Sequence, residues 1–121
     1  MNPAELFAHE SNALRLTPDE VLFKAGERGD SMYVVLEGAL EILVDNRVVG
    51  RSTRGDIIGE MALIDESPRS GTVVAREAST LVKVDAARFQ RLIQQNPFFA
   101  MHVMKVLVDR VRRVDQVRPA I

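Results

Sequence analysis

Short apolar segments separated by turn residues occupy residues 14–84, and this pattern limits the fold more than any other feature of the sequence. The segments are rich in β-prone residues, and glycine, proline, aspartate or asparagine fills most of the gaps between them. Their spacing of about 8–12 residues is typical of a sandwich or barrel, because such short strands bury their apolar faces best against one another. We therefore predict a closed or nearly closed antiparallel sheet.

The individual strands differ in their apolar pattern. Residues 32–36 form a continuous apolar run typical of a buried strand, whereas residues 39–44 largely alternate. A tight turn at Asp45 and Asn46 connects residues 39–44 to residues 48–49, which predicts a β-hairpin. The remaining predicted strands lie at residues 14–16, 21–23, 72–75 and 80–84.

After Asp85 the apolar period changes from two to about 3.6, which indicates helices. Asp85 is the predicted cap of a first helix that stops at Asn96, and Pro97 suits the first position of a second helix that reaches Val114. A short helical turn over residues 3–8 is expected at the start, with Asn2 as its cap. The chain is thus expected to be one domain over residues 1–121, with strands at about 14–85 and C-terminal helices at about 86–114.

Composition excludes several classes of protein. The chain has 121 residues, of which 46% are hydrophobic, and this fraction argues against disorder. Its 16 Lys and Arg against 17 Asp and Glu give a net charge of −1, which argues against nucleic-acid binding. It has no cysteine, so disulfides and thiolate metal sites are excluded. No apolar run approaches the roughly 20 residues of a membrane span, and the polar start is unlike a signal peptide. We expect a cytoplasmic protein that does not insert into membranes.

Enzymatic chemistry finds little support in the sequence. His9 and His102 lie far apart, without the neighbours that a triad or a metal site requires, and His102 is expected at the surface or an interface. The P-loop motif GxxxxGK, the dinucleotide-binding motif GxGxxG and the metalloprotease motif HExxH are absent from the sequence. We expect no catalytic residue, no metal site and no cofactor.

The densest signal lies at residues 55–72. Gly59 precedes a brief helix-prone stretch, whose free N–H groups favour an anion. Arg69 follows in a loop, where its planar guanidinium can hold two phosphate oxygens, and the Ser70 and Thr72 hydroxyls lie beside it. Glu60 repels phosphate and is expected to accept a hydrogen bond from a hydroxyl. Taken singly, Arg69 can also be read as a solvated loop residue and Glu60 as a carboxylate favoured by the helix dipole.

The segments GDIIGEMAL (residues 55–63) and PRSGTV (residues 68–73) resemble the phosphate-binding cassette of the cyclic nucleotide-binding domain family. LFKAGERGDSMYVVLEG (residues 22–38) is similar to the entry into that family's β-roll, and the likeness covers residues 17–114. The resemblance implies an eight-stranded antiparallel β-roll, jelly-roll-like, with a short cassette helix and C-terminal helices. Two departures stand out: Gly71 replaces a more usual alanine, and the helical preamble is shorter than in the family's transcription factors or channels.

The resemblance also implies how a cyclic nucleotide is held. Glu60 would accept the ribose 2′-hydroxyl, and Arg69 would pair with the exocyclic phosphate oxygens. The implied ligand-binding residues are Gly59, Glu60, Met61, Ala62, Arg69, Ser70 and Thr72, and candidates for the base wall, or else core residues, are Leu43, Val44, Val48 and Val49. cAMP is preferred to cGMP, although the Ser70 hydroxyl keeps cGMP open. Turn roles without ligand contact are expected for Gly26, Gly29, Gly38 and Gly50.

The last helix suggests how a signal leaves the domain. A short heptad seam is formed by Met104, Leu107, Val111 and Val114, and Val103 and Val106 extend it to a neighbouring face. We expect one face of this helix to pack on the roll. The other face is expected to cover the ligand, to meet a protein effector or to pair with the same helix of a second copy. The cations Arg110, Arg112, Arg113 and Arg118 are expected to form a solvated helix end.

Two further expectations concern the role of the domain. The fold accounts for nearly all of the chain, so output is expected from another polypeptide or from a further portion of a longer regulator. The alternative function is a degenerate domain that has lost its ligand and serves as a protein–protein docking module.

Overall fold

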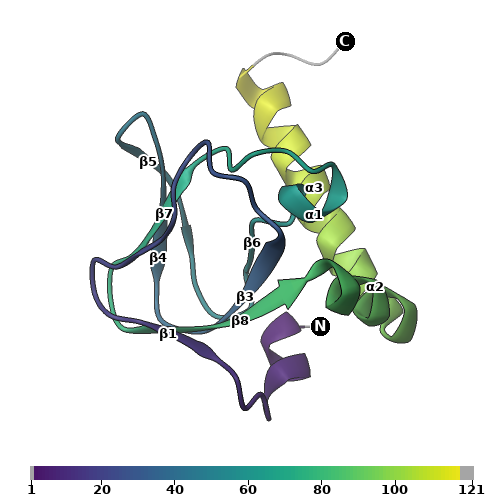
Figure 1. Cartoon of the computed structure of the whole chain (residues 1–121). Helices are drawn as coiled ribbons and strands as arrows, with labels where there is room; N and C mark the ends of the chain where they lie inside the picture. Colours follow the sequence, from purple (N-terminus) through teal and green to yellow (C-terminus); the bar gives the residue numbers. More distant parts are fainter. Residues whose placement is uncertain (1, 118–121) are drawn as a thin grey trace.

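The computed structural model describes the backbone of residues 2–117 and the side chains as far as Arg112 (Figure 1). A short 3₁₀ helix, η1 (Pro3–Phe7), precedes the strands, and Asn2 caps it by accepting a hydrogen bond from the Ala4 N–H. The strands are β1 (Leu14–Leu16), β2 (Val21–Phe23), β3 (Ser31–Glu37), β4 (Leu40–Val44), β5 (Arg47–Ser52), β6 (Ile57–Ile58), β7 (Thr72–Ala75) and β8 (Ser79–Asp85). The helices are α1 (Met61–Ile64), α2 (Ala86–Gln95) and α3 (Pro97–Val117).

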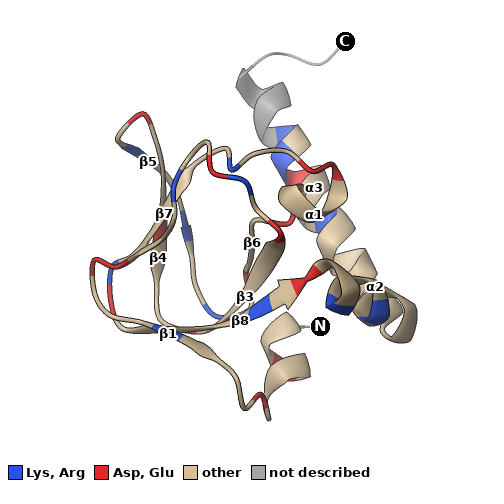
Figure 2. Cartoon of the chain, in the orientation of Figure 1, with Lys and Arg blue, Asp and Glu red and all other residues tan. Residues whose placement is uncertain are grey.

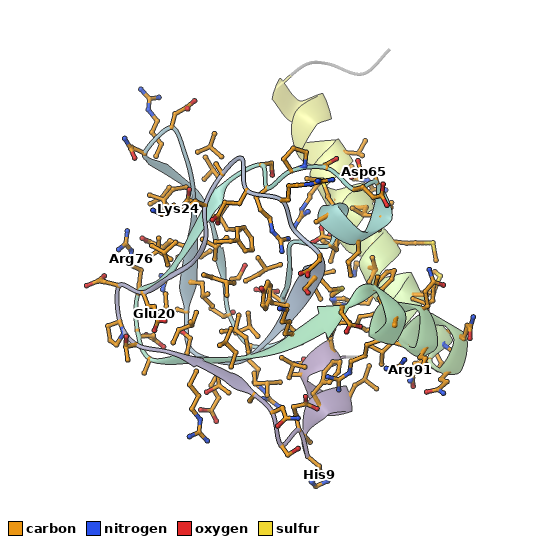
Figure 3. The ribbon with its side chains drawn as sticks, in the orientation of Figure 1. His9, Glu20, Lys24, Asp65, Arg76 and Arg91 are labelled. Atoms are coloured by element: carbon orange, nitrogen blue, oxygen red, sulfur yellow. The ribbon has the colours of Figure 1, made fainter. Side chains whose placement is uncertain are left out.

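The eight strands form two four-stranded sheets, with orders β1-β8-β3-β6 and β2-β7-β4-β5. Every strand pairing in them is antiparallel. The sheets face each other across an interior filled by side chains, and the helices stand beside the first sheet (Figures 1 and 3). The predicted fold class, a mainly β antiparallel roll followed by helices, is confirmed.

The apolar run in β3 is continuous because both faces of this strand are buried. Tyr33 and Val35 belong to the cluster between the two sheets, whereas Met32 and Val34 belong to a cluster that includes Phe99 and other helical residues. Successive side chains of a strand point to opposite faces, so a strand covered on both sides shows no polar alternation. The central strand β3 thereby joins the roll to its helical layer.

The predicted helix boundaries at Asp85 and Pro97 are confirmed. The Asp85 carboxylate accepts a hydrogen bond from the Arg88 N–H at 2.8 Å, and α3 begins at Pro97. Arg88 also donates two hydrogen bonds to the Glu10 carboxylate, at 2.9 and 3.0 Å, and its guanidinium lies 5.0 Å from the centre of the Phe7 ring. These contacts fasten the N-terminal segment to α2.

The seam predicted on α3 is only partly exposed, because one edge of it packs against the core. Leu107 packs inward together with Val103 and Val106, whereas Met104 and Val111 are exposed. The exposed apolar side chains of this helix form an outer stripe, which consists of Phe98, Met101, Met104, Val108 and Val111. The Val114 side chain lies outside the described residues.

Within residues 2–117, no helix is long and apolar enough to cross a membrane.

Candidate functional site

A cavity of about 660 Å³ lies between the second sheet, the cassette and α3. β4 and β5 supply one wall, including Val44, Val49 and Arg51, and α3 supplies Val106, Asp109 and Arg110. The cassette contributes Gly59, Met61 and Ala62 from its first segment and residues 68–71 from its second. The volume falls within the range of about 300–1,000 Å³ that small-molecule sites occupy.

Arg69 is one of three arginines that line this cavity, and only 7% of its surface is exposed. Its Nη1 donates to the Gly59 carbonyl at 3.0 Å, and its Nη2 donates to the Ser31 carbonyl at 2.7 Å. Its backbone is also held, since its N–H donates to the Glu27 carbonyl and its carbonyl accepts from the Gly26 N–H, both at 2.8 Å. Arg69 is therefore a fixed part of the site and not a solvated loop residue.

Two glycines leave the space that the Arg69 guanidinium fills. A Cβ added at Gly29 would lie closer than 3.0 Å to Cζ, Nε and Nη2 of Arg69, and one added at Gly59 would meet Nη1 equally closely. Gly59 also has a φ of +80°, which disfavours other residues. The sequence predicts only a turn role for Gly29, and the structure adds this close approach to Arg69.

Glu60 is fully buried and lies behind the cavity wall. Its Oε1 pairs with Nη1 of Arg110, which reaches it from α3, and its Oε2 has no hydrogen-bond partner among the described residues. Glu60 does not line the cavity, although its neighbours Gly59 and Met61 do. The expectation that Arg110 belongs to a solvated helix end is wrong, because its side chain is 36% exposed and neutralises a buried carboxylate.

The other predicted site residues divide into two groups. Met61, Ala62, Ser70, Val44 and Val49 line the cavity together with Gly59 and Arg69. Thr72, Leu43 and Val48 do not line it. The Thr72 hydroxyl instead accepts a hydrogen bond from the Ala25 N–H at 3.1 Å, so it tethers the loop between β2 and β3.

Gly71, which departs from the family pattern, fits its surroundings closely. A Cβ at this position would lie 3.0 Å from the Leu43 carbonyl oxygen and 3.3 Å from Cγ2 of Ile42. Glycine at position 71 thus lets the cassette loop approach β4.

Several cavity residues were not predicted from the sequence, among them Phe23, Arg51, Val106, Asp109 and Arg110. Phe23 comes from β2 and the last three come from α3, so they are far from the cassette in sequence. The exposed side of α3 carried a recognisable apolar signal, but nothing in the local pattern showed which of its charged residues turns inward.

Charged and titratable residues are spread over the rest of the fold. Basic and acidic segments are interspersed over the sheets and helices in Figure 2, and the described residues contain no group of three His, Cys, Asp or Glu that could hold a metal ion. His9 lies on the N-terminal segment, at the opposite end of the view from Asp65 next to α1 (Figure 3). Burial lowers the pKa of His102, which lies on α3.

Comparison with known proteins matches the chain to one domain family and to solved structures of similar fold. A family profile described as "Cyclic nucleotide-binding domain" matches residues 13–96. The structure of "cAMP bound PfPKA-R (141-441)" is similar, with a TM-score of 0.73 and 28% identity over 87% of this chain and 36% of that one.

Two curated relatives are parts of larger proteins. "Lysophospholipase NTE1" of Pyricularia oryzae is 34% identical over 106 residues, which cover 84% of this chain but 7% of that protein. "Pycsar effector protein PaPycTIR" of Pseudomonas aeruginosa is 36% identical over 107 residues, 87% of this chain and 35% of that protein. The chain thus matches one domain of each relative, and the activities in those names describe the larger proteins.

Proposed function

This chain belongs to the cyclic nucleotide-binding domain family, and from that premise we propose that it is a sensor which binds a 3′,5′-cyclic nucleotide in the cavity. The observation that carries the proposal is Arg69, a buried guanidinium on the cavity wall. It has five N–H donors, of which two are taken by the Gly59 and Ser31 carbonyls. The remaining donors suit the exocyclic oxygens of a phosphate, with the Ser70 hydroxyl and cassette N–H groups beside them.

Glu60 is proposed to accept the ribose 2′-hydroxyl. Its Oε2 is buried, and no described residue donates to it. A buried acceptor without a donor costs about 1–3 kcal/mol, so a hydroxyl supplied by a ligand would be favourable there. Because Glu60 stands behind the wall and under Arg110, this contact requires Glu60 to turn toward the cavity or Arg110 to withdraw.

The base is proposed to lie between apolar side chains of the hairpin and α3. Val44 and Val49 offer one surface and Val106 the other. Such a slot suits adenine, so cAMP is the preferred ligand, while the Ser70 hydroxyl next to Arg69 would also accommodate guanine.

Calorimetric titration with cAMP and cGMP tests the proposal. A dissociation constant near 1 µM, about −8 kcal/mol, is within reach of one phosphate clamp, one ribose contact and a partly buried base. Arg69→Ala removes charge-assisted hydrogen bonds of about 1.5–3 kcal/mol each, so we expect affinity to fall at least 100-fold. Arg47→Ala, at the exposed start of β5, is the matched control and should bind normally. Failure of both nucleotides to bind below millimolar concentration would overturn the proposal.

The proposed role is regulatory and not catalytic, and binding is proposed to need no metal or other cofactor. Addition of EDTA should therefore leave the titration unchanged. A cytoplasmic location is part of the proposal and is checked by cell fractionation.

The signal is proposed to leave through α3, by a protein effector or by pairing with a second copy. The outer stripe supports this, since its five apolar side chains are 47% to 71% exposed. Light scattering tests for the dimer, and Val108→Glu should abolish it, whereas Arg15→Glu, at an exposed position of β1 away from α3, serves as control. A monomer at high concentration with and without nucleotide would leave the effector route alone.

A second candidate function is a docking module without ligand. The observation that favours it is Arg110, which already neutralises Glu60 and shields it from the cavity. Mass spectrometry of the protein purified from cells separates the two functions, because co-purifying cAMP would argue against the docking module.

A further inference from the structure

The Arg69 guanidinium lies on the face of an aromatic ring. Its Cζ is 4.1 Å from the centre of the Phe23 ring and 5.9 Å from the centre of the Tyr33 ring. The two rings are themselves 6.2 Å apart, at an interplanar angle of 35°. Phe23 is half-buried at the end of β2, and it lines the same cavity as Arg69.

No carboxylate among the described side chains forms an ion pair with Arg69, although the guanidinium is almost fully buried. Burying a charge without an ion-paired carboxylate is costly. Here two carbonyl dipoles, the negative face of the Phe23 ring and the longer-range attraction of Asp30 offset that cost. The positive charge therefore stays available to an anion that enters the cavity.

The ring also restricts the orientation of the guanidinium. The Gly59 and Ser31 carbonyls accept from Nη1 and Nη2, which leaves Nε–H and one hydrogen on each Nη. Two hydrogen bonds at one end of the guanidinium allow its plane to tilt about the line that joins the two nitrogens. The Phe23 ring, which is stacked on the face of the guanidinium, opposes that tilt. The absence of a side chain at Gly29 admits the guanidinium to this position.

From these contacts we propose that Phe23 is a positioning residue for anion recognition: its ring holds the guanidinium plane of Arg69 so that the remaining donors meet the phosphate oxygens of the ligand. The inference rests on the proposed function, since it concerns the same site. It assigns to β2, outside the cassette, a part in binding.

The test compares Phe23→Leu and Phe23→Tyr by calorimetry with cAMP. Phe23→Leu keeps an apolar side chain without the ring, so binding must also order the Arg69 side chain. Ordering one long side chain costs about 0.5–1.5 kcal/mol, which predicts a roughly 2- to 13-fold loss of affinity. Phe23→Tyr keeps the ring and should restore most of the affinity. Phe89→Leu, which removes a ring from the helical core and does not touch Arg69, is the control for lost stability.

A second measurement separates positioning from a merely structural role. Sulfur accepts hydrogen bonds poorly, so the Sp and Rp phosphorothioate analogues of cAMP report on which phosphate oxygen faces Arg69. We expect the wild-type protein to discriminate between them, Phe23→Leu to discriminate less, and Phe89→Leu to keep the wild-type ratio. Equal affinities and equal ratios in Phe23→Leu and wild type would overturn the inference, as would equal losses in Phe23→Leu and Phe89→Leu.

The calorimetric titrations distinguish failure of the proposed function from failure of the inference about Phe23. Failure of the wild-type protein to bind any cyclic nucleotide overturns the proposed function, and the inference with it, whereas normal binding by Phe23→Leu overturns the inference alone. Should Phe23→Leu fail to fold, the side-chain NMR signals of Arg69 in the free wild-type protein decide. A ring held over the guanidinium shifts them upfield, and shifts typical of an unstructured arginine would refute the stack.

Discussion

Replacement of Arg110 by methionine is the most informative perturbation of the site. Methionine keeps an unbranched apolar stem on α3 but removes the guanidinium that pairs with Glu60 Oε1. Glu60 is fully buried, and its other oxygen has no partner among the described residues. The substitution therefore leaves a buried carboxylate without its neutralising cation.

The expected magnitude follows from the burial of the two partners. Removing one member of a buried ion pair costs about 3–5 kcal/mol, because the other charge is left uncompensated. The Arg110 side chain is 36% exposed, so water can reach Glu60 once the guanidinium is gone, and about 2–3 kcal/mol is the expected loss. For a domain of this size that corresponds to a fall of roughly 8–12 °C in Tm.

Urea denaturation of four proteins tests this reasoning: wild type, Arg110→Met, Glu60→Gln and the double variant. Because the glutamine carries no charge, the double variant should be more stable than the sum of the two single losses predicts. Arg112→Met, an exposed neighbour on α3, is the control and should change the free energy of unfolding by less than about 0.5 kcal/mol. An Arg110→Met protein as stable as wild type, or strictly additive losses, would refute the account of the pair.

Three further predictions concern the scaffold. Gly38→Ala should destabilise the roll by at least about 2 kcal/mol in urea, since φ is +100° and the new Cβ would collide with Ser79, while Gly50→Ala should be tolerated. Asn46→Ala should lower the free energy of unfolding by about 1–2 kcal/mol, because the two-residue turn has positive φ at both positions and alanine lacks the local hydrogen bonds by which asparagine tolerates it. Arg88 holds the pKa of Glu10 below its usual value, so this pair stabilises the fold above the unfolded pKa of about 4.3. The stabilisation is lost as the pH falls through the folded pKa, so Tm measured between pH 7 and pH 3 should fall further in wild type than in Glu10→Gln.

The sequence predicted the framework well because its signals are local. Asp85 and Pro97 mark helix ends through their own backbone chemistry, and the turn at Asp45 and Asn46 depends on two adjacent residues. The strand β6 was not predicted from the pattern, since two residues are too few to show alternation. It exists because Ile57 and Ile58 pair with Val34 and Tyr33 of β3, a partner distant in sequence.

The site was predicted only in part for a related reason. The cassette is contiguous, so Gly59, Arg69 and Ser70 could be grouped from spacing alone, and the structure brings them to one cavity. Arg110 and Phe23 enter from α3 and β2, and their roles depend on how those elements cross the cassette. Gly29 shows the same limit, since its proximity to Arg69 is a tertiary contact that a turn glycine does not reveal.

The position of α3 links the two surfaces for which a function is proposed. Val106 and Arg110 of this helix face the cavity and Glu60, while Met104, Val108 and Val111 of the same turns form part of the outer stripe. Arg110 can withdraw by a change of side-chain rotamer alone or together with a shift of α3, and only in the second case does the outer stripe move with it. Thermodynamic linkage then makes the effect reciprocal: a nucleotide that tightens self-association by a given factor must bind the dimer more tightly than two monomers by the corresponding factor.

Sedimentation measurements of the dimer dissociation constant with and without cAMP, set against calorimetry at low and high protein concentration, test that equality directly. Agreement between the two factors is required if α3 is the coupling element, and a nucleotide affinity that is independent of protein concentration would separate the cavity from the stripe.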